Sequence, residues 1–294
     1  MSLDNKKQSL TTIARLVETS STGTGGSDNV ENYSDAVSGK GPDKVKIFDR
    51  LLANNMLVAG SNLGRNIQDD YRRIKRPLVS NACGRNKSMV DRGNLILVTS
   101  SIPDEGKTYT SINLALSISQ EMDTTVLLVD SDVVKQGVSR MLGLEKLPGL
   151  VDVLECDDLT INDVLLQTDI PNLRVMPAGK QHEYVAEMLA SQRMSDLINE
   201  MARRYKDRII IIDGPPLLPT PLTQILAGLV GQVVFVIEAG KTPQSLVEEA
   251  LALIPEEQAT GLVMNKNEGL SSRGSYYYGY YSSEDDVSVN DKKS

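Results

Sequence analysis

The chain has 294 residues, a formal net charge of −8, two cysteines and one histidine. This length allows one α/β domain with flanking segments, and the acidic charge disfavours nucleic acid as a partner because a phosphate backbone needs a basic surface. No apolar run approaches the roughly 20 residues that span a bilayer, and the polar start of the chain does not resemble a signal peptide. Cys83 and Cys156 lack metal or disulfide spacing. We therefore expect a cytoplasmic protein.

Three regions follow from the composition along the chain. Residues 1–43 are rich in Ser, Gly, Thr, Asn and Asp and are expected to form a flexible leader, with one short helix over 10–17. Residues 44–268 carry the apolar patterns of one folded domain. Residues 269–294 return to a polar composition and are expected to be a disordered tail.

The folded region opens with two helical patterns and then alternates between strands and helices. A small helix is expected at 48–52, and a second one over 67–76, where Pro77 should end it. The expected strands are 94–100, 124–130, 172–177, 208–213, 232–238 and 260–264. The expected helices are 107–120, 149–155, 185–204, 221–229 and 243–253. This alternation predicts a doubly wound, mostly parallel sheet with helices on both faces.

The first apolar strand leads into a loop that ends in Gly106-Lys107-Thr108 and opens a helix. Backbone N–H groups at such a strand–loop–helix junction point toward phosphates. In this arrangement Lys107 reaches the β/γ-phosphates, and the Thr108 hydroxyl holds Mg²⁺. The strict pattern G-x-x-x-x-G-K-[ST] fails at its first glycine, where Ser101 stands, so a helix that begins with Gly-Lys-Thr by chance is the alternative interpretation.

Carboxylates at the ends of two further strands strengthen the phosphate-binding interpretation. One apolar strand ends in Asp130-Ser131-Asp132 and another in Asp213. A single Asp after a strand is usually a turn former. Ligands in parallel sheets, however, bind beyond the carboxyl ends of the strands, where Asp130, Asp132 and Asp213 all fall. We therefore expect these aspartates to serve catalysis and Mg²⁺ binding, with ATP as the nucleotide.

The C-terminal tail holds a dense tyrosine cluster. Five of the ten tyrosines of the chain, Tyr276, Tyr277, Tyr278, Tyr280 and Tyr281, lie within six positions. They are flanked by Gly, Ser and acidic residues and contain no Val, Ile or Leu among them. A merely sticky low-complexity tail is one interpretation. Beside an ATP site, exposed phenols on a tether are better interpreted as phosphoryl acceptors.

Together these segments resemble the bacterial tyrosine kinases (BY-kinases), whose P-loop fold is related to the MinD and ParA ATPases. Residues 102–108 resemble the family's x-P-G-E-G-K-[ST] loop, 127–132 its hhhD-x-D motif and 212–216 its hD-x-P-P motif. Residues 70–76 resemble its E-x-x-R-x-x-R helix, and 263–266 the segment whose Asn contacts adenine. The chain resembles especially the free-standing cytoplasmic autokinases of exopolysaccharide gene clusters. The resemblance implies that residues 44–268 form a P-loop kinase domain.

The resemblance implies roles for individual residues. It implies nucleotide contacts for the loop and helix start and for the adenine-contacting segment, namely Asp104, Glu105, Gly106, Lys107, Thr108, Tyr109 and Asn265. Lys107, Asp130, Asp132 and Asp213 are the expected catalytic residues, with Asp130 as the base, or Asp132 if the roles are exchanged. Thr108, Asp132 and Asp213 are the expected Mg²⁺ ligands. Asp70, Arg73 and Arg76 are expected at an oligomer interface, where the alternative is a solvated charged face.

The resemblance also implies partners and leaves two rival functions open. It implies a homo-oligomeric ring that phosphorylates tails in trans. It further implies a separate inner-membrane polysaccharide copolymerase that acts as activator and holds the kinase at the membrane periphery, and control of exopolysaccharide chain length or export. A MinD/ParA-like positioning ATPase and a nucleotide-binding scaffold without kinase activity are the rivals. Three departures bear on activity: Ser101, Asp104 in place of a glycine, and Val134 where arginine is usual.

Overall fold

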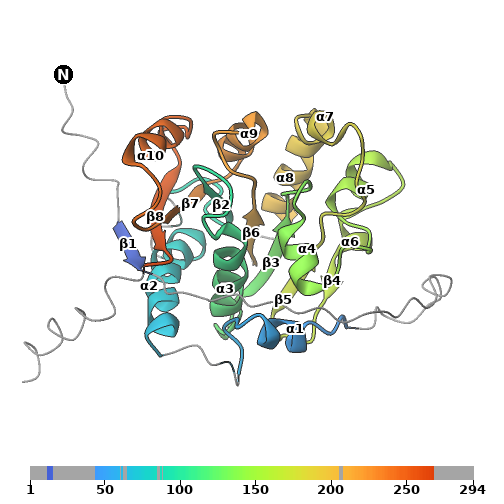
Figure 1. The fold of residues 1–294 in the computed structure, drawn as a ribbon. Coiled ribbons are helices and arrows are strands. Elements are labelled where there is room, and N and C mark those ends of the chain that lie inside the picture. The colour runs from blue at the N-terminus through green and yellow to red at the C-terminus, as the bar shows by residue number, and fades with distance from the viewer. Residues whose placement is uncertain are drawn as a thin grey trace, which may run out of the picture.

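The structure is a computed structural model that describes residues 12–15, 44–59, 61, 65–84, 87, 89–204 and 208–267. Among these residues, eight strands form one sheet in the order β1-β8-β7-β2-β6-β3-β5-β4, which runs from left to right in Figure 1. The strands are β1 Thr12–Arg15, β2 Leu95–Ser100, β3 Thr125–Asp130, β4 Leu166–Gln167, β5 Leu173–Met176, β6 Arg208–Asp213, β7 Gln232–Glu238 and β8 Ala259–Asn265. Neighbouring strands are parallel except β4 and β5, which are antiparallel.

Ten helices among the described residues cover the two faces of this sheet (Figure 1). They are α1 Phe48–Ala53, α2 Arg65–Ala82, α3 Lys107–Ser119, α4 Gly137–Leu142, α5 Leu150–Glu155, α6 Ile161–Val164, α7 Val185–Leu189, α8 Gln192–Arg204, α9 Pro221–Leu229 and α10 Gln244–Leu251. Side chains of α1 to α4 pack with one alternate set of strand residues, and those of α5 to α10 with the other set. The predicted doubly wound, mostly parallel fold is confirmed.

The strands of the sheet centre are buried on both faces, which explains their almost uninterrupted apolar sequences. All six residues of β2 are buried, as are five of the six residues in β3 and in β6. Their register places Asp130 beside Asp213, and Val98 on the other side of Asp213. The carboxyl ends of β2, β6 and β3 therefore meet at one edge of the sheet, as the strand-end aspartates predicted.

Two helix predictions fail in ways that packing explains. The helix expected over 10–17 is wrong for its described part, because Thr12–Arg15 form β1 and pair in parallel with β8. Pro77 does not end α2, which continues to Ala82. The apolar stripe of α2 extends past the proline through buried Leu78 and Ala82. Packing of this stripe outweighs the hydrogen bond that the proline removes.

The helix expected over 185–204 is two helices, α7 and α8, separated by Ala190 and Ser191. Ser191 accounts for the break. Its hydroxyl donates to the Met188 carbonyl at the end of α7 and accepts a hydrogen bond from the Met194 amide in the first turn of α8. A serine in this position caps the second helix, a signal that the apolar periodicity of the region concealed.

Two glycines offer a test of the packing. A Cβ at Gly149 would lie 2.0 Å from the Pro177 carbonyl oxygen and 2.5 Å from the Gly179 nitrogen, whereas a Cβ at Gly228 in α9 would meet no atom within 4 Å. We expect Gly149→Ala to lower the free energy of unfolding by roughly 1–3 kcal/mol. Gly228→Ala should raise it by roughly 0.5–1 kcal/mol, because alanine favours helix. Urea unfolding followed by circular dichroism measures both, and equal effects would contradict this packing.

Candidate nucleotide site

The loop after β2 owes its shape to a glycine that no other residue can replace. Gly106 caps α3 with φ at +95°, in the left-handed region. A Cβ at this position would lie 1.8 Å from Nδ2 of Asn265, at the end of β8. That Nδ2 donates to the Glu105 carbonyl oxygen at 2.9 Å. The end of β8 thus presses against the loop and fixes the direction in which its backbone amides point.

Glu105 fastens the same loop from within. Its side chain is fully buried. Oε2 accepts from the Ile102 amide at 2.8 Å, and Oε1 accepts from the Glu238 amide at 3.2 Å and from the Thr242 hydroxyl at 2.5 Å. Because these donors occupy its carboxylate, the predicted nucleotide contact of Glu105 would use its main-chain amide rather than its side chain.

Asp213 joins the end of β6 to the first turn of α3. Its Oδ2 accepts from the Thr108 hydroxyl and its Oδ1 from the Ser111 hydroxyl, both at 2.8 Å. Burial raises the pKa of Asp213 to about 6, although these two hydrogen bonds and the Lys107 charge oppose the rise. A Cβ at Gly137 would lie 2.5 Å from the Thr108 hydroxyl oxygen, so glycine is needed for α4 to begin this close to Thr108.

Asp130 lies beside Asp213 with no exposed surface. Its Oδ2 accepts from the amide and the hydroxyl of Ser139, at 2.8 and 2.7 Å. Its Oδ1 is buried and has no hydrogen-bond partner among the residues that the structure describes. Burial, followed by repulsion from Asp213, raises the pKa of Asp130 to about 8. The carboxyl therefore holds a proton at neutral pH in the ligand-free protein, which lessens the cost of its burial.

Two further charged residues complete the edge. Lys107 is buried at the start of α3, and desolvation lowers its pKa while the nearby carboxylates of Asp213 and Asp132 oppose the change. Asp132 is also buried, and its Oδ1 accepts from the Lys135 amide at 3.1 Å. A buried lysine at a helix N-terminus is a favourable partner for a phosphate, because the lysine and the helix dipole are both positive there and a phosphate can form charged hydrogen bonds with the lysine.

These residues fit Mg²⁺ and a nucleotide. The hydroxyl–carboxylate pair Thr108–Asp213 and the buried carboxylate of Asp132 are oxygens of the kind that Mg²⁺ binds, and the buried Oδ1 of Asp130, which has no partner among the described residues, leaves a free acceptor beside them. Across the described ranges no group of three or more His, Cys, Asp or Glu side chains is arranged to hold a metal alone. Substrate phosphates would therefore supply some of the Mg²⁺ ligands, as they usually do.

Not all predicted site residues gather here. Lys107, Thr108, Asp130, Asp132, Asp213 and Asn265 lie at this edge of the sheet. Tyr109 points away, because its hydroxyl donates to the Asn55 carbonyl at 3.2 Å. On α2, Asp70 is buried whereas Arg73 and Arg76 are exposed. The tyrosines of 276–281 lie outside the described residues. Their predicted roles remain predictions.

Sequence reasoning missed the residues that hold the site residues in place. Ser111, Ser139 and Thr242 bond the carboxylates of Asp213, Asp130 and Glu105. Ser111 lies one helical turn after Lys107, so its place on the same face could have been inferred from spacing. Ser139 lies in α4, 9 residues after Asp130, and Thr242 lies before α10, 137 residues after Glu105. Their sequence neighbourhoods carry no such signal.

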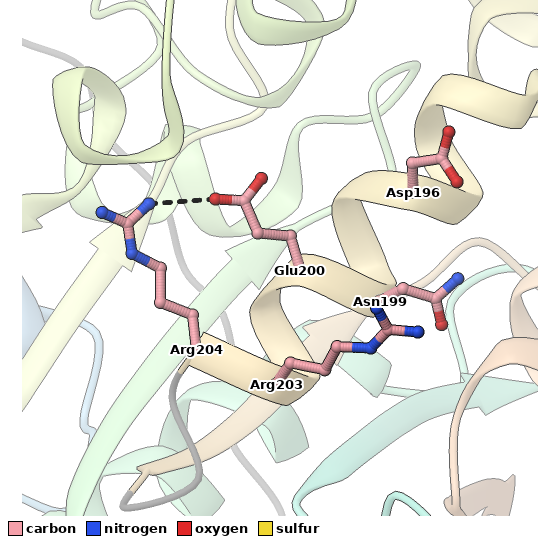
Figure 2. A pocket seen from close by; sticks show the side chains of 5 residues that line it. All are labelled: Asp196, Asn199, Glu200, Arg203 and Arg204. Carbon is pink, nitrogen blue, oxygen red and sulfur yellow. Dashed lines mark hydrogen bonds and ion pairs between the residues drawn. The ribbon is translucent and has the colours of Figure 1, made fainter.

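A surface pocket elsewhere does not belong to this site. A hollow of about 430 Å³ on α8 is lined by Asp196, Asn199, Glu200, Arg203 and Arg204, and Arg204 pairs with Glu200 at 2.9 Å. Figure 2 shows these five side chains. A larger hollow of about 700 Å³ shares Asn199 and Arg203 and reaches Asn94, before the amino end of β2. Both therefore lie away from the carboxyl ends of the strands.

The geometry of this site is that of a P-loop nucleotide-binding protein. Its phosphate cradle is a helix start with a left-handed glycine, a buried lysine and a hydroxyl bonded to a strand-end aspartate.

Known proteins share this class. A family model described as an AAA domain matches residues 98–249. The tyrosine-protein kinase YwqD of Bacillus subtilis is 33% identical over 193 residues, covering 65% of this chain and 78% of YwqD. The tyrosine-protein kinase CpsD of Streptococcus agalactiae is 30% identical over 203 residues, covering 67% of this chain and 86% of CpsD.

Solved structures agree with these relatives. The VpsO kinase domain matches with a TM-score of 0.58 and 27% identity, covering 68% of this chain and 96% of that domain. The chimerical protein CapA2B2 matches with a TM-score of 0.60 and 25% identity, covering 77% of this chain and 94% of the chimera. The chain therefore belongs to the bacterial tyrosine-kinase family, a class of protein-tyrosine kinases with a P-loop fold, and the resemblance in the sequence is confirmed.

The helices of the described residues are all too short or too polar to cross a membrane.

The raised pKa of Asp130 predicts a pH-dependent stability. An unfolded aspartate ionises near pH 4, so between about pH 4 and pH 8 ionisation favours the unfolded chain and the free energy of unfolding falls as pH rises. Asp130→Asn removes this loss. In ligand-free protein, its Tm should exceed that of the native chain by several degrees more at pH 8 than at pH 5, since one pKa unit corresponds to about 1.4 kcal/mol. Asp69→Asn on the exposed surface of α2 is the control, and a Tm difference independent of pH would contradict the burial argument.

Proposed function

We propose that this chain is an ATP-dependent autokinase that phosphorylates its own C-terminal tyrosine cluster, in trans within an oligomer. The observation that carries the proposal is the position of Asn265. It ends β8 and donates to the Glu105 carbonyl, so the chain leaves the sheet beside the phosphate cradle. The stretch from Lys266 to Tyr276 can span at most about 35 Å. The first acceptor is therefore tethered within reach of its own site or of a neighbour's.

The arrangement supports a division of roles. Lys107 and the loop amides bind and orient the phosphates, with Thr108, Asp132 and Asp213 as ligands for Mg²⁺. The metal ion supplies charge neutralisation for the transferring phosphoryl group. Asp130 takes the proton from the attacking phenol, whose ordinary pKa is near 10. The proton that its raised pKa of about 8 retains would be released when Mg²⁺ binds beside it, and the resulting carboxylate would then be free to accept the proton of the phenol.

Oligomerisation and location rest on relatives and on α2. Arg73 and Arg76 are exposed on α2, where we propose that they face a neighbouring subunit of a ring. A relative that is 30% identical over 187 residues is named a succinoglycan biosynthesis transport protein, ExoP of Rhizobium meliloti. We accordingly propose a cytoplasmic kinase at the periphery of the inner membrane. An inner-membrane copolymerase chain would hold and activate it, and its phosphorylation state would regulate exopolysaccharide chain length or export.

A complementation experiment tests both transfer and direction. Lys107→Met removes the phosphate-binding charge and should abolish phosphotyrosine without changing the circular dichroism spectrum. A second variant replaces Tyr276, Tyr277, Tyr278, Tyr280 and Tyr281 with phenylalanine and keeps an intact site. Labelled ATP and Mg²⁺ should label neither variant alone, and their mixture should label only the Lys107→Met chain.

Other outcomes identify other functions. Phosphotyrosine on the Lys107→Met chain alone would show that the loop is not the active cradle. Release of free phosphate without phosphotyrosine from the native chain would indicate a positioning ATPase, and neither product would indicate a scaffold. Labelling of the native chain but not of the mixture would replace transfer in trans with transfer in cis.

The roles of two aspartates can be separated by binding and rate. Asp213→Asn should weaken Mg²⁺-dependent binding of a fluorescent ATP analogue, because a neutral amide is a poorer metal ligand than a carboxylate and leaves only one acceptor oxygen for the hydroxyls of Thr108 and Ser111. Asp130→Asn should bind the analogue nearly as the native chain does but slow phosphotyrosine formation by about 10²–10⁴-fold, the usual contribution of a general base. Equal losses of binding in the two variants would remove this distinction.

A further inference from the structure

Asp104 is an unusual residue for a phosphate cradle. It lies in the loop two residues before Gly106 with φ at +67°, in the left-handed region that glycine normally occupies. Aspartate is among the few other residues that adopt this region readily. Its side chain is 81% exposed, so packing does not require it. It also places a negative charge on the loop that receives the negative phosphates.

A lysine from across the site cancels this charge. Lys135, from the loop between β3 and α4, places its Nζ 2.8 Å from Asp104 Oδ1. The hydrogen bond from Lys135 lowers the pKa of Asp104, so the carboxylate is charged at neutral pH. The two residues lie 31 positions apart in the chain, and the ion pair links the β2 loop to the β3 loop.

The backbone holds each partner in place. The Lys135 amide donates to Asp132 Oδ1 at 3.1 Å, which ties the lysine to an expected metal ligand. The Asp104 carbonyl oxygen accepts from Lys266 Nζ at 2.6 Å, and Lys266 also pairs with Glu238 at 3.2 Å. Lys266 is therefore shared between a carbonyl and another carboxylate, whereas Lys135 is the cation that contacts the carboxylate of Asp104. An exposed pair like this adds little to stability, so its consequence is the charge presented to the site.

We propose that Lys135 is a positioning residue for nucleotide affinity: by pairing with Asp104 across the phosphate cradle, it cancels the repulsion that Asp104 would exert on the phosphates. This inference rests on the proposed nucleotide binding and adds a determinant of that affinity. It follows that Lys135 is needed only because Asp104 is present. The charges of Asp104 and Lys135 compensate each other, and we expect Asp104 without Lys135 to lower the affinity for the nucleotide.

A double-mutant cycle on the full-length chain tests this dependence. Binding of a fluorescent ATP analogue with Mg²⁺ is measured for the native chain, Lys135→Met, Asp104→Asn and the double variant. Asparagine tolerates positive φ, so Asp104→Asn removes the charge and keeps the loop. Lys135→Met alone should raise Kd by about tenfold, while the double variant should stay within about threefold of the native Kd. Lys135→Arg should bind like the native chain, and the loss in Lys135→Met should shrink at high salt.

Lys180→Met is the matched control, because Lys180 forms a surface ion pair with Glu155 at 2.5 Å and its loss changes the net charge equally. If Lys135→Met costs the same affinity in the native chain and in the Asp104→Asn background, the proposal is overturned and Lys135 is a direct phosphate ligand. No loss in either background, or the same loss in Lys180→Met, would also overturn it. Failure of the native chain to bind the analogue would instead refute the proposed function.

Discussion

The buried carboxylate of Asp213 organises the site. It lies at the end of a central strand and accepts hydrogen bonds from two hydroxyls in the first turn of α3, Thr108 and Ser111. The carbonyl oxygen of Asp213 also accepts from the Ser131 and Asp132 amides that begin the next loop. One residue thus fixes the helix start on one side and the β3 loop on the other. Thr108 and Asp132 take their positions from these bonds, and Lys107 and Asp130 lie on the helix and the strand that adjoin them.

The cost of this arrangement is electrostatic. Three aspartates meet at one sheet edge, and two of them have raised pKa values because burial disfavours their charge. The protein offsets the cost locally, with Lys107 among the carboxylates and hydroxyls from Ser111 and Ser139. The site is therefore poised for a ligand that brings positive charge along with phosphates, and a magnesium nucleotide has this composition.

Sequence reasoning reached the central sheet and the chemistry of the strand ends, because continuous apolar strands and the residues that follow them are local signals. It placed Gly106, Lys107, Thr108, Asp130, Asp132 and Asp213 at one edge, where the structure has them. It failed where distant packing decides, as in the continuation of α2 beyond Pro77 and the pairing of Thr12–Arg15 with β8. It also missed Ser139 and Thr242, which meet the site only once the chain is folded.

The raised pKa values of Asp130 and Asp213 couple ligand binding to protons. With pKa values of about 8 and about 6, the two carboxyls are partly protonated near neutral pH and would lose protons if a cation bound beside them. These protons pass to the buffer, so the heat of nucleotide binding includes the buffer's own heat of ionisation. Calorimetry in two buffers of different ionisation enthalpy therefore counts the protons released, and affinities measured at different pH values are not directly comparable.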